Sequence, residues 1–68
     1  MKYFVHTKKD AEGDYEVHTK DCHKLPLVDN RKELGEYSSC TPAVAEAKRL
    51  GYTPTNGCIH CCKPCHTS

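Results

Sequence analysis

His18-Thr19-Lys20-Asp21-Cys22 and Gly57-Cys58-Ile59-His60-Cys61 are the two stretches that decide the fold of this 68-residue chain. Each stretch contains a closely spaced pair of nitrogen or sulfur donors, His18 with Cys22 and Cys58 with Cys61, and together these two pairs offer one imidazole and three thiols. Two such pairs, far apart in a sequence, are how the four donors of a tetrahedral zinc site are usually arranged. The sequence therefore predicts one Zn²⁺ site, and its ligands are His18, Cys22, Cys58 and Cys61.

The size of the chain gives the metal a structural importance. Residues 1–68 are enough for a single domain and too few for two. At this length hydrophobic burial barely offsets the entropy lost on folding, and the aromatic content is low, with four Tyr, one Phe and no Trp. A structural Zn²⁺ contributes about 10–16 kcal/mol of apparent binding free energy, which goes into folding. We therefore expect a single zinc-stabilised domain.

The six cysteines can be metal ligands or form disulfides, and the choice depends on the compartment. The N-terminus has only three apolar residues in a row, residues 3–5, before it becomes charged, so it lacks the apolar segment of a signal peptide. No apolar stretch of the sequence is long enough to span a membrane. These features predict a cytoplasmic protein with reduced cysteines. A secreted domain held together by disulfides, its signal peptide removed, is the alternative.

The charges of the chain are balanced along its length. Residues 1–34 carry seven Lys or Arg and seven Asp or Glu, residues 35–68 carry three and two, and the net charge is +1. Proteins that bind nucleic acid usually concentrate basic residues in one region. A nucleic-acid partner is therefore compatible with the sequence but is not supported by its charge.

The first third of the chain predicts a β-hairpin. Residues 3–7 and 15–19 are rich in β-branched and aromatic side chains, and the charged stretch between them contains a glycine. Residues 24–34 are expected to form a loop or a short irregular element, because Pro26 disfavours a helix there. Residues 35–39 are then expected to form a brief extended segment, which would add a third short strand to the sheet.

Residues 42–50 predict the clearest helix of the chain. Thr41 is a good N-cap, and Pro42 suits the first helical position, where its missing N–H has no partner to lose. Gly51 can adopt the left-handed conformation that commonly follows a helix end. The sequence therefore places the helix between Thr41 and Gly51.

One face of this predicted helix is apolar. Val44, Ala47 and Leu50 recur at helical spacing, with Ala43 beside them, so we expect this face to pack on the hairpin. The predicted fold class is α+β. It combines an N-terminal hairpin or short three-stranded sheet, one helix over residues 42–50, and a C-terminal zinc knuckle.

The C-terminal segment has more donors than one site needs. Asn56-Gly57 is a common tight-turn pair, and it would start a knuckle that carries Cys58 and Cys61. Replacement of Cys61 by Cys62 or Cys65 is the main alternative ligand set. Thiols outside the site are expected to be buried or spare. The number of remaining donors would allow a second metal site, but these donors do not form two closely spaced pairs. They are Cys40, Cys62, Cys65 and His66.

The order of these features resembles the Ada-type metal-binding module, the small zinc domain that opens bacterial methylphosphotriester-repair proteins. The resemblance covers roughly residues 15–64. It is carried by His18-x-x-x-Cys22, by residues 39–47 with Glu46-Ala47, by Gly51-Tyr52-Thr53-Pro54, and by Cys58-Ile59-His60-Cys61. In that family a zinc-bound cysteine at the first ligand position accepts a methyl group from a DNA phosphotriester. Here that position is His18, so the resemblance implies the fold and the zinc but not the methyl transfer.

Two classes of function follow from a four-ligand site. Four protein ligands leave no open coordination position, and no acid–base pair, phosphate-binding loop or activated nucleophile is readable in the sequence. The first hypothesis is therefore a monomeric, non-catalytic module that recognises a protein or nucleic-acid partner. The alternative is chemistry at sulfur, in which a zinc-bound thiolate accepts an alkyl group or the chain acts as a DNA-associated, repair-like module.

Overall fold

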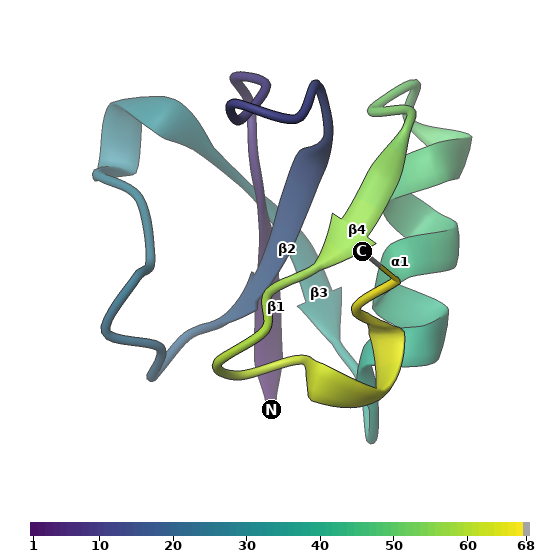
Figure 1. Cartoon of the computed structure of the whole chain (residues 1–68). Helices are drawn as coiled ribbons and strands as arrows, with labels where there is room; N and C mark the ends of the chain where they lie inside the picture. Colours follow the sequence, from purple (N-terminus) through teal and green to yellow (C-terminus); the bar gives the residue numbers. More distant parts are fainter. Residues whose placement is uncertain (68) are drawn as a thin grey trace.

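The structure is a computed structural model that describes residues 1–67. Within this range four strands form one mixed sheet in the order β3-β1-β2-β4, and one helix packs against it (Figure 1). The elements are β1 (Lys2–His6), β2 (Tyr15–Thr19), β3 (Arg31–Glu36), α1 (Cys40–Arg49) and β4 (Thr55–Gly57), with 3-10 turns at Val28–Asn30 and Lys63–Cys65. The predicted α+β class is confirmed.

The N-terminal hairpin is also confirmed. β1 and β2 are antiparallel, and Val5 lies opposite Val17. The connecting loop is ordered by the carboxylate of Asp10, which accepts hydrogen bonds of 2.9 Å from the backbone N–H groups of Glu12 and Asp14. An Asp side chain that accepts hydrogen bonds from backbone N–H groups a few residues later is common in turns.

β3 begins earlier than the sequence predicted. It starts at Arg31, inside the stretch expected to be irregular, and it pairs antiparallel with β1 at the edge of the sheet. Because an edge strand has one open side, charged residues such as Lys32 and Glu33 are favoured there, and they hide the apolar alternation by which strands are recognised. A bulge near Gly35, whose φ is 119°, interrupts the pairing and places Leu34 in the core.

The prediction of a tight turn at Asn56-Gly57 was wrong. Both residues belong to β4, which runs parallel to β2 with Asn56 opposite Glu16 and Gly57 opposite Val17. The glycine is needed for close approach instead, since a Cβ atom at position 57 would lie 2.7 Å from the carbonyl oxygen of Cys62. A glycine inside a strand often marks such an approach of two backbone segments.

We expect Gly57→Ala to lower the free energy of unfolding by about 1–3 kcal/mol, because the added methyl group overpacks the contact between β4 and the C-terminal segment. Urea denaturation at a fixed zinc concentration measures the loss. Gly13→Asn is the matched control, since position 13 has open space and asparagine tolerates its positive φ. Equal stability of the two variants would show that the close approach at Gly57 is not required.

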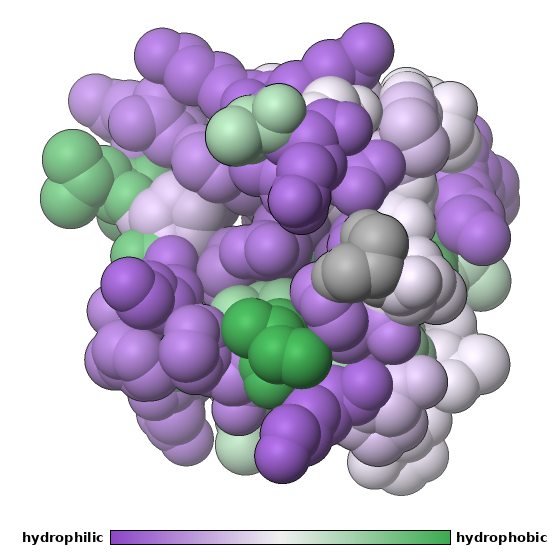
Figure 2. Space-filling view, viewed as in Figure 1, coloured by the Kyte–Doolittle hydropathy of each residue, from purple (hydrophilic) through white to green (hydrophobic). Residues whose placement is uncertain are grey.

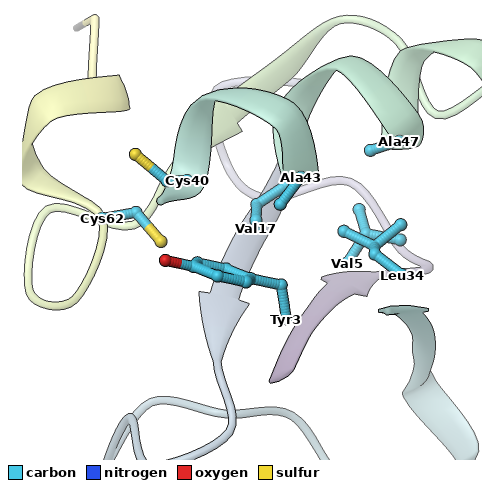
Figure 3. Packing of buried hydrophobic residues seen from close by; sticks show 8 residues of the cluster. All are labelled: Tyr3, Val5, Val17, Leu34, Cys40, Ala43, Ala47 and Cys62. Carbon is cyan, nitrogen blue, oxygen red and sulfur yellow. The ribbon is translucent and has the colours of Figure 1, made fainter. Parts of the chain in front are cut away.

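The hydrophobic core lies between the sheet and α1. Tyr3, Val5 and Val17 project from one face of the sheet toward the helix (Figure 3). Ala43 and Ala47 face them from α1 and are completely buried. Small side chains on the helix let it approach the sheet closely, but they bury little apolar area, so this core supplies a modest part of the stability.

The ends of α1 differ in part from the prediction. The helix begins at Cys40 with Ser39 as its N-cap, so Thr41 and Pro42 lie in the first turn, where proline loses no intrahelical bond. Leu50, predicted in the core, is the C-cap and is 39% exposed. Gly51 confirms its predicted role, with a φ of 97° and an N–H that donates to the Lys48 carbonyl at 3.0 Å.

Hydrophobic side chains on the molecular surface are scattered. The face shown in Figure 2 is mostly hydrophilic, and its hydrophobic groups are small and separate. The most exposed large aliphatic side chains are Leu27 and Val28, near the tip of the excursion between β2 and β3. Within residues 1–67 no helix is long and apolar enough to cross a membrane.

Candidate metal centre

The parallel pairing of β2 and β4 brings the two predicted donor pairs together. Parallel strands end at the same edge of a sheet, and Val17 lies opposite Gly57, so His18 and Cys58 are the next residues in register. The N–H of Cys58 donates to the Val17 carbonyl at 3.0 Å. The segment after each of these two strands then turns, and it brings Cys22 and Cys61 back toward the strand ends. The sheet therefore joins segments that are about forty residues apart in the sequence.

The donor atoms of His18, Cys22, Cys58 and Cys61 all lie within 4.8 Å of one another. The sulfur atoms of Cys22 and Cys58 are 3.9 Å apart. In a tetrahedral zinc site with Zn–S bonds near 2.3 Å, two sulfur ligands lie about 3.8 Å apart. The spacing of these side chains thus fits a four-coordinate metal, and the set is the one that the sequence predicted.

His18 has the environment of a metal ligand. Its side chain is only 2% exposed, and its Nε2 lies 3.2 Å from a carboxylate oxygen of Glu16. Its Nδ1 is buried and has no hydrogen-bond partner among the residues described. A buried nitrogen without a partner is costly. Coordination of a metal by Nδ1 would satisfy this atom, while the hydrogen bond from Nε2–H to Glu16 fixes the tautomer and orients the ring.

Sequence reasoning missed Glu16, although a signal for it was present. Residues two apart in a strand share a face, so a carboxylate two positions before a predicted histidine ligand can reach the ring. Burial raises the pKa of Glu16, with the charge of Asp10 adding to the effect and nearby histidines opposing it. The partly desolvated carboxylate is a strong acceptor for the imidazole N–H.

The three thiols each accept a backbone N–H hydrogen bond. The N–H of Lys24 lies 3.4 Å from the Cys22 sulfur, that of His60 lies 3.4 Å from the Cys58 sulfur, and that of Thr19 lies 3.3 Å from the Cys61 sulfur. Hydrogen bonds to a thiolate stabilise its charged form. At Cys22 burial outweighs the hydrogen bond from Lys24 and raises the pKa of the thiol, so a bound metal would supply most of the stabilisation of its thiolate.

Cys62 is close to this cluster but belongs to the core. Its sulfur is 3.8 Å from that of Cys61, and its side chain lies beside Cys40 and Tyr3 under the helix (Figure 3). Burial, together with the neighbouring Cys61, raises the pKa of Cys62 to about 12. The thiol is therefore neutral at physiological pH. This agrees with the prediction of a buried spare thiol.

The expectation of six reduced cysteines was wrong. Cys40 and Cys65 form a disulfide with an S–S distance of 2.11 Å and a Cα–Cα distance of 6.4 Å. The bond excludes Cys65 as a replacement for Cys61. It also rules out the second metal site that would have used Cys40, Cys62, Cys65 and His66. The disulfide joins the start of α1 to the C-terminal 3-10 turn, an approach that only the assembled fold creates. Among the described residues, the four free cysteines are Cys22, Cys58, Cys61 and Cys62.

Acid is expected to lower the stability of the chain progressively below about pH 6.5. Burial lowers the pKa of His18 to about 4 from its ordinary value near 6.5, with the charges of His6 and His60 adding to the shift. As the pH falls below 6.5 the unfolded chain takes up this proton before the folded chain does, so the stability present above pH 6.5 is lost toward pH 4 and below, and a metal on His18 would oppose its protonation further. Protons also compete with the metal for the thiolates.

Circular dichroism against pH, with the released zinc measured in parallel, tests this expectation. His6→Ala is the control, since it removes a histidine outside the donor set whose charge contributes less than burial to the lowered pKa of His18, so it should shift the window only slightly. An ellipticity that stays constant down to pH 4 would contradict the prediction.

Comparison of the chain with protein-family models, with curated proteins and with solved structures finds no match. The resemblance to the Ada-type module therefore has no support from these comparisons. The structure supports a more general description, a small α+β fold with a histidine and cysteine cluster that could hold a metal ion.

Proposed function

We propose that this chain is a small zinc-binding protein whose Zn²⁺ is structural and is held by His18, Cys22, Cys58 and Cys61. The observation that carries the proposal is that four donor atoms from two distant segments lie within 4.8 Å of one another. Three thiols and one imidazole form a donor set typical of structural zinc sites. The otherwise unpartnered Nδ1 of His18 adds to this support.

The surroundings of the donors favour a structural role over a catalytic one. Four protein ligands fill a tetrahedral shell, so water or a substrate has no position to occupy. The N–H groups that point at the three sulfur atoms lower their nucleophilicity by stabilising negative charge. We therefore propose that the chain is not an enzyme and that the metal connects the ends of β2 and β4.

We further propose that the folded domain recognises a partner. The resemblance to the Ada-type module favours an accessory role beside nucleic acid, but two observations favour a protein partner. The net charge of the chain is only +1. Zn²⁺ bound to three thiolates and a neutral imidazole carries a net charge of −1, which repels phosphates near the site. The charges of the chain therefore favour a protein partner over a nucleic acid.

Counting metal and thiols on the native protein tests the zinc site. We expect one zinc per chain, four titratable thiols after denaturation with a chelator, and one disulfide. Cys61→Ala should lose the metal, whereas the matched variant Cys62→Ala should keep it. A native chain without zinc, or one with all six cysteines oxidised, would overturn the proposal.

Alkyl transfer to sulfur is the second candidate, because Cys22 and Cys61 are only partly buried. Incubation of the zinc-loaded chain with a methylating agent or with a duplex that contains methylphosphotriesters, followed by intact mass, separates the two functions. We expect no stoichiometric mass gain. A gain of one methyl group on a single ligand cysteine would favour the alkyl acceptor and contradict a purely structural zinc.

A further inference from the structure

Two histidines outside the proposed ligand set lie beside the zinc site. His23 follows the ligand Cys22, and His60 stands between the ligands Cys58 and Cys61. Their rings are in edge-to-face contact, with centroids 4.9 Å apart and an interplanar angle of 64°. Both side chains are exposed. Two imidazoles from segments 37 positions apart in the sequence therefore meet at the surface of the candidate metal centre.

The spacing of the two rings suits a shared metal ion. Two imidazoles bound to one metal with bonds near 2.1 Å, at angles between square and tetrahedral, have ring centres roughly 4.5–5 Å apart. The observed separation of 4.9 Å falls in this range, so the two exposed rings are close enough to bind one ion between them. Imidazole is a suitable donor for zinc, copper and nickel.

The charge of the neighbouring site favours a cation at this position. A zinc ion with three thiolates and a neutral imidazole leaves a net charge of −1, and the carboxylate of Glu16 on the His18 ring adds another negative charge. His60 is close enough for its charge to influence both Glu16 and His18. A divalent ion bound by the exposed rings would thus be attracted to the charge of the first site.

We propose that His23 and His60 form a second, exposed transition-metal site with two imidazole donors and open positions for water or a small anionic ligand. The proposal rests on the first zinc site, because that metal holds the two loops together. The second site differs from the first in chemistry: it has nitrogen donors only, it is accessible, and its coordination shell is incomplete. It can therefore exchange its metal while the fold stays intact.

Calorimetric titration of the tag-free, one-zinc chain with Zn²⁺ at pH 7.5 tests the proposal. The first site is already filled with the same metal, so added zinc cannot displace it. We expect one further equivalent to bind more weakly than the first, with shifts of the His23 and His60 ring resonances in proton NMR spectra. His23→Ala and His60→Ala should each lose this second event, and His6→Ala should keep it.

The variants also separate this proposal from the structural zinc site. Apo protein of each variant is titrated in parallel, and His23→Ala and His60→Ala should still bind the first zinc. Failure of the wild-type chain to bind a first zinc contradicts the proposed function itself. A wild-type chain that binds one zinc only, or a second event that persists unchanged in both histidine variants, overturns the second site.

Discussion

Removal of the metal with EDTA is expected to unfold the chain, and Cys22→Ser is expected to do the same. A structural zinc at the proposed site would contribute about 10–16 kcal/mol of apparent binding free energy, which is comparable to or greater than the whole stability of a typical small domain. The core cannot replace it, because its completely buried members include two alanines and two valines. Far-UV circular dichroism and the dispersion of amide proton resonances should both report an unfolded chain.

The control for this prediction is the neighbouring thiol in the core. Cys62→Ala removes a sulfur atom 3.8 Å from Cys61 without removing a proposed ligand, so the variant should stay folded with zinc bound. Returning zinc to the EDTA-treated wild type should restore its spectrum. A Cys22→Ser chain that folds without metal would show that the donor assignment or the dependence on zinc is incorrect.

Local patterns account for the parts of the fold that the sequence predicted correctly. The hairpin, the helix closed by Gly51 and the cluster of four donors each depend on short-range signals. The donor pairs in particular are spaced so that one turn brings each pair together, and a tetrahedral metal has few other ways to be bound. This explains why the four donors could be identified without knowledge of the sheet.

Long-range pairings account for the parts that could not be predicted. β4 contains Asn56 and Gly57, whose local preference is for turns, and only the parallel pairing with β2 makes them a strand. The approach of Cys40 to Cys65 likewise depends on how the C-terminal segment packs against α1. Glu16 differs from both, since the alternation of residues along β2 was sufficient to place it beside His18.

Loss of the disulfide is expected to lower the free energy of unfolding of the zinc-loaded chain by about 3–4 kcal/mol while leaving it folded. The bond closes a loop with a sequence separation of 25, and the chain-entropy estimate for such a loop is about 3.5 kcal/mol. The double variant Cys40→Ala/Cys65→Ala, compared with wild type by urea denaturation at a fixed zinc concentration, measures the effect. The folded spectrum should persist, because the donors at the ends of β2 and β4 are separate from the disulfide.

The reduced wild-type chain separates the contribution of the bond from that of the two side chains. If the disulfide acts mainly by restricting the unfolded chain, reduction should lower the stability nearly as much as the double variant does. A much larger loss in the double variant would instead indicate a packing defect, because Cys40 is buried against the core. Unfolding of the reduced chain with zinc still present would contradict the prediction, since it would make the disulfide, not the metal, the principal constraint on the fold.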